Sequence, residues 1–182
     1  MTAALGNDDM HNNFAMIPPD GRILYFARDR ASFRFLSHFY QSPIIVDDEK
    51  WPTVEHYFQA QRSNDPAYRG AIRQAKTPGE AKRLAASPEA PRGISKQSWF
   101  RKHGMQPRAD WRDVKLDIMR RGDWAKFTQN PPLAEMLLAT GCAELIEDSP
   151  VDAFWGQGPD GLGQNWAGRI LMEIRSRLRS SE

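Results

Sequence analysis

The sequence predicts a mainly α-helical fold: a single compact domain with a small β-hairpin near its N-terminal end. Signals for helix starts recur along most of the 182 residues, whereas the apolar runs typical of strands occur only before residue 52. The chain shows neither internal repeats nor a second hydrophobic block. We therefore expect a flexible arm over residues 1–18, followed by one domain over residues 19–182.

The predicted β-structure comes first along the chain. Residues 23–26 form a short apolar run that predicts a strand. Residues 44–46 and 50–51 flank the acidic segment 47–49. A short polar turn between an apolar run and a segment that ends in tryptophan is typical of a hairpin, so we expect one at this position.

Helices account for most of the remaining chain. Thr53 is a good N-cap for a helix that buries Val54, Tyr57 and Phe58, and Pro66 and Pro78 suit the first turns of two further short helices. Residues 84–110 are broken by prolines and glycines, so we expect an irregular, basic insertion there.

The C-terminal part of the chain contains three more helix patterns. Asp110 and Asp113 resemble a capping box that opens a helix running to about Phe127. A second helix is expected from the proline pair 131–132 to about residue 140, where Gly141 suits a C-cap. The last helix should span about residues 166–178, with Asn165 as its cap.

Composition excludes several classes of protein. The chain has neither a signal-peptide pattern nor an apolar run long enough to span a membrane, and the lone Cys142 cannot form an internal disulfide, so we expect a cytoplasmic protein. The four histidines are scattered without partners at metal-ligand spacing, so we expect no metal. The three glycines of residues 156–161 match a dinucleotide pattern that we interpret as accidental.

Positive charge is concentrated in the middle of the chain. The net charge is only +2, but residues 92–121 hold nine lysines and arginines against three aspartates. Such a stretch favours an anionic ligand, with phosphate as the common case. A solvated positive surface would give the same pattern.

Two acids are candidates for chemistry. Glu55 shares a helix face with Gln59 and Arg62, although the helix dipole alone also favours an acid in the first turn. Asp152 and Trp155 precede a glycine-rich loop over residues 156–163. A loop acid and a core tryptophan would explain that pattern equally well.

Lysines and a helix start complete the candidate set. Lys115 and Lys126 fall close to the apolar side of the helix that begins at Trp111. A lysine there can reach the surface along its own stem, or it can act as a nucleophile or charge partner at a sugar carbon. Asn165 and the N–H groups of the final helix could bind an anion.

Six sequence blocks occur in one order from about residue 20 onward, at residues 35–40, 51–61, 75–83, 111–119, 126–141 and 149–172. In these blocks the chain resembles the NADAR, or YbiA-like, family. The resemblance implies a compact, mainly α domain that hydrolyses N-glycosidic bonds. One branch of that family acts on ribosylamino-pyrimidine phosphates of riboflavin synthesis, and another removes ADP-ribose from guanine bases.

The resemblance also implies which residues act. Glu55 and Asp152 match the catalytic acids, and Trp111 and Trp155 match aromatic residues of the site. We expect the acids to stabilise charge at the anomeric carbon and to move a proton. Further substrate contacts are expected from Ser37, His38, Phe39, Gln59, Gly156, Gly158 and Asn165, and Lys82, Lys115 and Lys126 are candidates for a lysine that forms an imine.

The chain departs from the family pattern in three places. His38 stands where asparagine is usual, Arg62 stands where lysine often occurs, and residues 84–110 form a longer insertion. The insertion favours a large or nucleic-acid-linked substrate, or else a lid. No cofactor is expected. Two rival functions remain open: a module that binds ADP-ribose or a nucleotide without hydrolysis, and a basic nucleic-acid-binding protein.

Overall fold

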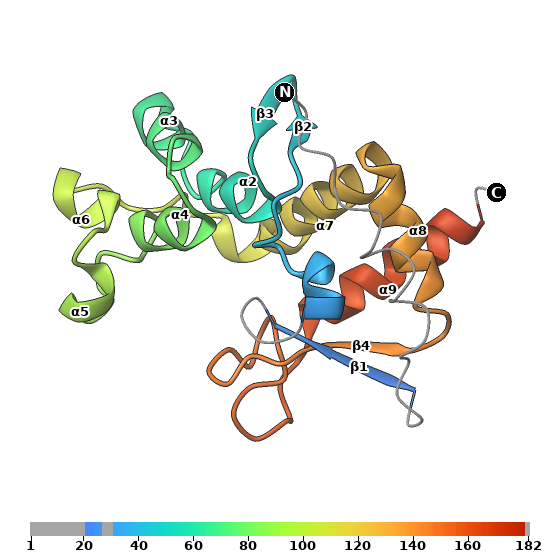
Figure 1. Cartoon of the computed structure of the whole chain (residues 1–182). Helices are drawn as coiled ribbons and strands as arrows, with labels where there is room; N and C mark the ends of the chain where they lie inside the picture. Colours follow the sequence, from blue (N-terminus) through green and yellow to red (C-terminus); the bar gives the residue numbers. More distant parts are fainter. Residues whose placement is uncertain (1–20, 27–30, 181–182) are drawn as a thin grey trace. The chain divides into compact units, whose positions relative to one another are not determined.

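The chain is described here by a computed structural model, which defines residues 21–26 and 31–180 (Figure 1). The expected N-terminal arm, residues 1–18, lies outside the described residues. The prediction of a mainly α fold is confirmed, because helices dominate and every strand is short. In chain order the elements are β1 (Arg22–Tyr25), the 3-10 helix η2 (Ala31–Leu36), β2 (Ile44–Val46), β3 (Glu49–Trp51), α2 (Val54–Ala60), α3 (Pro66–Arg73), α4 (Pro78–Leu84), α5 (Arg92–Ser95), α6 (Trp99–His103), α7 (Trp111–Gln129), α8 (Pro131–Ala139), β4 (Glu144–Glu147) and α9 (Trp166–Arg179).

The elements group into two compact units. The central unit comprises residues 38–131, and the terminal unit comprises residues 21–26, 31–37 and 132–180 of the described chain. The terminal unit therefore combines the two ends of the sequence. The prediction of one domain over residues 19–182 stays a prediction, and each unit is described by itself below.

Helix α2 is the core of the central unit. It packs against β3, α3, α4 and α7, and all seven of its residues are buried, including the polar side chains. Gly122 allows α7 to come this close, because a Cβ atom there would lie 3.0 Å from side-chain atoms of both Val54 and Tyr57. The expected burial of Val54, Tyr57 and Phe58 is confirmed. The opposite face of the helix, which carries Glu55 and Gln59, is buried as well.

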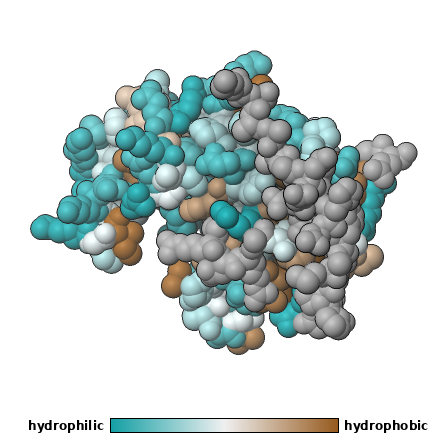
Figure 2. Space-filling model, viewed as in Figure 1, coloured by the Kyte–Doolittle hydropathy of each residue, from teal (hydrophilic) through white to brown (hydrophobic). Residues whose placement is uncertain are grey.

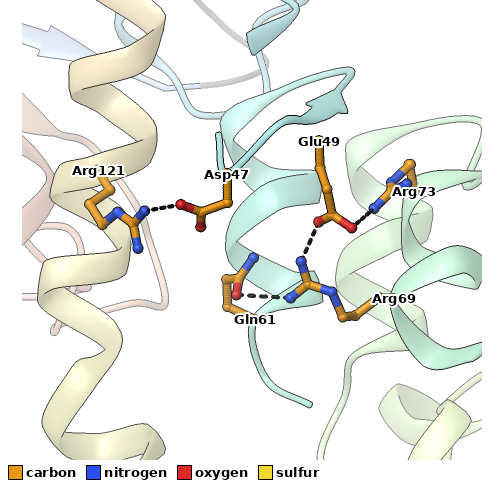
Figure 3. A network of polar contacts seen from close by, with 6 residues as sticks. All are labelled: Asp47, Glu49, Gln61, Arg69, Arg73 and Arg121. Carbon is orange, nitrogen blue, oxygen red and sulfur yellow. Dashed lines mark hydrogen bonds and ion pairs between the residues drawn. The ribbon is translucent and has the colours of Figure 1, made fainter. Parts of the chain in front are cut away.

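The predicted hairpin is confirmed as β2 and β3, which pair in antiparallel register with Ile44 opposite Trp51. Its two turn residues, Asp47 and Asp48, have φ values of 53° and 61°, as a tight hairpin turn requires. Asp47 receives a hydrogen bond from Arg121, and Glu49 pairs with both Arg69 and Arg73 (Figure 3). These ion pairs tie the hairpin to α7 and α3.

Residues 84–110 are non-helical over most of their length, but they include two short helices that the sequence analysis did not predict. They form α5 and α6, joined to their surroundings by serine hydroxyls: Ser95 Oγ donates to Ala90 O at 2.8 Å and Ser98 Oγ donates to Ala86 O at 2.6 Å. Phe100 is fully buried against Tyr68, with ring centroids 4.7 Å apart. Hydrogen bonds from serine side chains to the backbone and the buried ring of Phe100 hold these short helices in place. Neither kind of contact produces a periodic hydrophobic pattern in the sequence.

The terminal unit contains the predicted strand near residues 23–26, which is β1, and a partner strand, β4, that the sequence analysis missed. Strand β4 runs parallel to β1, with Ile23 opposite Leu145, and α9 packs against β4. Arg175, on α9, is buried and donates to Thr140 Oγ1 at 2.6 Å and to Ala143 O at 2.8 Å. A four-residue strand with acids at both ends carries little hydrophobic pattern, which explains why it was missed.

Two predicted helix caps are wrong in detail, although the helix starts are confirmed. Asp110 and Asn165 both occupy N-cap positions, but neither side chain makes a capping hydrogen bond. The Asp110 carboxylate instead accepts two bonds from Arg108, at 2.5 and 2.6 Å. The predicted caps at Thr53 and the prolines that start α3 and α4 are confirmed.

Candidate functional site

Local structure positions Glu55 in the first turn of α2. Thr53 caps the helix by accepting the His56 N–H, and its hydroxyl also lies 2.8 Å from His56 Nδ1. The other ring nitrogen of His56 lies 3.1 Å from the Ala75 carbonyl, which can only accept, so that nitrogen carries the proton. Burial lowers the pKa of His56, which fits a neutral ring with a structural role.

Glu55 is an acid held in the interior of the central unit. It is 5% exposed, its Oε1 accepts a bond from Gln59 Nε2 at 2.8 Å, and its backbone N–H donates to His38 O at 3.1 Å. Burial raises the pKa of this carboxyl, while Lys82, the Gln59 bond, His38 and Arg62 act in the opposite direction. An acid with a raised pKa keeps its proton to a higher pH, as a proton donor in a reaction must.

Lys82 and Phe39 lie together near this acid. Lys82 is exposed on α4, and its ammonium lies 5.9 Å from the centre of the Phe39 ring. Its charge is the largest influence that lowers the pKa of Glu55. The structure therefore brings Glu55, Gln59, His38 and Lys82 into one neighbourhood.

Trp111 begins α7 and packs with residues that follow Glu55. Its ring centroid lies 4.9 Å from that of Phe58, and the Arg62 guanidinium lies 5.4 Å from the Trp111 ring centre. The sequence analysis placed Glu55, Gln59 and Arg62 on one helix face. In the structure Glu55 and Gln59 lie in α2, whereas Arg62 lies just beyond it, one residue after the C-cap. The half-buried Trp111 is thus linked to α2 by aromatic and cation–π contacts.

Helix α7 carries a buried acid that the sequence analysis missed. Asp123 is fully buried, and its Oδ2 lies 3.0 Å from His38 Nε2. Lys126, one turn further along α7, is also fully buried, and burial lowers the pKa of its ammonium to about 8. Lys115 is half-buried. The sequence signal that could have indicated this buried acid was an aspartate three residues before a lysine on the apolar side of the helix.

The terminal unit holds the second predicted acid. Asp152 is half-buried, and its Oδ1 accepts the backbone N–H groups of Phe154 at 3.0 Å and Trp155 at 2.9 Å. Its own N–H donates to Ser149 Oγ at 3.1 Å. Asp152 therefore shapes the turn that contains Trp155. Ser37, another predicted substrate contact, is buried and belongs to the same unit.

Glycines make the following loop compact. A Cβ atom on Gly156 would lie 2.6 Å from Glu147 O, and one on Gly158, whose φ is +69°, would lie 2.9 Å from the Ala153 Cβ. These close approaches require glycine at both positions. The Asn165 amide accepts the Glu147 N–H at 3.0 Å and donates to Leu145 O at 2.8 Å, so it joins the end of the loop to β4.

Neither a metal site nor a membrane span emerges from the residues that can be described. Over residues 21–26 and 31–180, histidine, cysteine and acidic side chains do not gather in groups of three or more that could hold a metal ion. Within those ranges every helix is too short or too polar to cross a membrane.

Comparison with known proteins places these features in a family. The NADAR domain model matches residues 25–179. N-glycosidase YbiA of Escherichia coli is 38% identical over 156 residues, which cover 86% of this chain and 88% of that protein. A riboflavin biosynthesis protein of Vibrio vulnificus is 39% identical over 156 residues, although the chain spans only 38% of its length.

Solved structures agree with the sequence comparison. The NMR structure of Escherichia coli YbiA matches with a TM-score of 0.71 and 36% identity, over 87% of this chain and 85% of that one. Both the family model and the structural match extend over residues of both compact units. The chain belongs to the NADAR family.

Proposed function

We propose that this protein is an N-glycosidase that hydrolyses a ribose C–N bond. The observation that carries the proposal is Glu55, a buried acid whose pKa burial raises and which lies among cationic groups. Membership of the NADAR family and relatives named as N-glycosidases support the same reaction. A pure binding module for a phosphate-bearing ligand would gain nothing from such an acid.

Two acids, Glu55 and Asp152, have different roles in the proposed reaction. As the C–N bond breaks, positive charge develops on the anomeric carbon. Glu55, whose pKa burial raises, donates a proton to the departing base nitrogen. Asp152 stabilises the positive carbon or directs the attacking water, while Trp111 and Trp155 stack on flat groups of the substrate, worth about 1–3 kcal/mol per base.

A lysine offers a second route to the same products. The neutral amine would attack C1 of the ribose, and the C–N bond to the base would break as the base leaves with one of the amine's protons. The ring bond between C1 and O4 would then open, and O4 would take the remaining amine proton, which leaves an imine at C1. Water would then hydrolyse the resulting imine, restoring the amine and releasing the sugar. Among Lys82, Lys115 and Lys126, the fully buried Lys126 suits this role best, because a pKa of about 8 leaves some of its amine neutral near pH 7.

For the substrate, we propose a base in nucleic acid that carries ADP-ribose. Residues 82–103 hold six lysines and arginines against the single acid Glu89, and this surface is mostly hydrophilic (Figure 2). The exposed Lys82 begins this basic stretch and also influences Glu55. Phosphates beside the modified base would find cations there. A ribosylamino-pyrimidine phosphate is the second candidate, favoured by relatives named for riboflavin biosynthesis.

Product analysis tests the function. The protein would be incubated with guanine-ADP-ribosylated DNA and, separately, with a ribosylamino-pyrimidine phosphate, and products would be followed by mass spectrometry. Release of ADP-ribose supports the nucleic-acid substrate, and cleavage of only the small phosphate supports the metabolite. If ADP-ribose binds but neither compound is cut, the protein is a binding module and the proposal fails.

A further inference from the structure

The pair formed by His38 and Asp123 is not used in the reaction proposed above. Asp123 is 0% exposed, and only one of its carboxylate oxygens, Oδ2, has a hydrogen-bond partner among residues 21–26 and 31–180. Burying a carboxylate with half of its bonding capacity unused costs free energy. A purely structural position on α7 would be filled more stably by an apolar residue.

Charged groups of the central unit interact with this pair or with Glu55, which contacts it. Lys126 follows Asp123 by one turn on α7, and the negative charge of Asp123 raises the pKa that burial has lowered. Glu55 approaches from α2 and is bonded to the His38 backbone. Lys82 on α4 and Arg62 after α2 also influence Glu55. A series of contacts therefore runs from Glu55 through His38 and Asp123 to Lys126, and so connects the acid and the lysine that the two proposed routes use.

The geometry constrains the His38 ring. A carboxylate oxygen can only accept a hydrogen bond, so an ionised Asp123 requires the proton on His38 Nε2. In the neutral ring this leaves Nδ1 as the accepting nitrogen. The contact thus selects one tautomer and one ring orientation.

We propose that Asp123 is a positioning residue, which holds the His38 ring in one orientation and tautomer beside Glu55 and balances the charge of Lys126. The inference rests on the proposed N-glycosidase reaction for its catalytic consequence. It adds a specific role for His38.

The tautomer can be measured without any substrate. In the full chain with ¹⁵N-labelled histidine, we expect the nitrogen chemical shifts of His38 near pH 7.5 to report a proton on Nε2. His56 has its own assigned tautomer and serves as an internal comparison, because its Nε2 also carries the proton. A proton found on His38 Nδ1 alone would overturn the inference.

A charge-removing variant tests the link to Lys126 and to turnover. In Asp123→Asn, Lys126 should titrate at a lower pH than in the wild type, because a nearby negative charge is lost. With a substrate that the wild type cleaves, kcat should fall about tenfold to a hundredfold while KM changes by less than about threefold. Asp117→Asn, an exposed change on the same helix, should alter neither.

The outcomes separate the inference from the proposed function. If Asp123→Asn does not fold, the double variant Asp123→Asn with Lys126→Met removes both buried charges together, and the His38 tautomer is then measured in that protein. Unchanged kcat and unchanged Lys126 titration in a folded Asp123→Asn variant would refute the positioning role. A wild type that cleaves no N-glycoside refutes the function, while the tautomer and the Lys126 titration still decide the role of Asp123.

Discussion

The two compact units handle polar groups in opposite ways. The central unit buries charged side chains, including Glu55, Asp123 and Lys126, and leaves their electrostatic costs partly uncompensated. In the terminal unit, the polar groups of the glycine-rich loop make hydrogen bonds with the backbone and with Asn165. Glycines let the chain segments of this loop approach closely. The central unit therefore holds buried charged groups, whereas the terminal unit holds a tightly packed loop.

The two proposed acids show the contrast most directly. Glu55 accepts one side-chain bond in the interior, and burial raises its pKa. Asp152 is half-buried and uses Oδ1 to hold two N–H groups of its own turn. Glu55 is therefore better suited to carry a proton, and Asp152 to remain in a fixed place as part of the loop.

The largest expected effect follows from Glu55→Gln. The amide keeps the shape and can still meet Gln59, but it cannot donate a proton to a leaving base, so kcat should fall by about 10²–10⁴. Turnover of the substrate cleaved by the wild type measures this directly. A folded variant with wild-type turnover would remove Glu55 from the mechanism.

The same variant should change how stability depends on pH. Because the native pKa of Glu55 lies above its unfolded value, the folded state binds the proton more tightly. Wild-type stability should fall as pH rises from about 4.5 through the native pKa, and this part of the loss should vanish in Glu55→Gln. Urea unfolding across that pH range compares the two proteins.

In the terminal unit, Gly168→Ala should cause the largest loss of stability. A Cβ atom at this position in α9 would lie 1.9 Å from the backbone oxygen of Leu145, so the helix must move away from β4. We expect a loss of about 3 kcal/mol in the free energy of unfolding. Gly70→Ala in α3 is the matched control: nothing lies within 4 Å of the new methyl, and stability should rise by up to about 1 kcal/mol. Equal effects at the two sites would contradict the close packing of α9 on β4.

Lys126→Met tests the buried charge in the central unit. The native pKa of about 8 lies below the ordinary value of 10.5, so the unfolded chain binds more protons between these pH values. Wild-type stability should therefore gain about 2–3 kcal/mol from pH 8 to 10.5 relative to Lys126→Met. Parallel denaturation curves at both pH values give this difference, and identical pH slopes would argue against a buried, weakly basic lysine.

The smallest stability effects are expected at Asp152. Asp152→Asn keeps an oxygen for the two N–H groups, so stability should change by less than about 0.5 kcal/mol, whereas Asp152→Ala should lose about 1–2 kcal/mol. The activities of the two variants distinguish a catalytic role of Asp152 from a structural one. If Asp152→Asn loses turnover while its stability is retained, the charge takes part in catalysis; if only Asp152→Ala is impaired, the residue acts by shaping the loop.

Local patterns were sufficient for much of the fold. The Thr53 cap, the prolines of α3 and α4, the Asp47–Asp48 turn and the final helix depend on interactions within a few residues, so the sequence alone determined them. The ordered blocks likewise determined the family. Strand β4 depends instead on pairing with β1 more than a hundred residues away, and the order of residues 84–110 depends on Phe100 meeting Tyr68.

The candidate site divides in the same way. Sequence alone indicated Glu55, Gln59 and an inward lysine, because their spacing and residue types are local properties. Only the tertiary structure decided that α2 is buried on every side, that Lys126 is the lysine fully removed from water, and that Asp123 meets His38 across 85 positions of sequence. Burial and long-range contact set the pKa values and partners of these groups, and both arise from how helices pack rather than from their own residues.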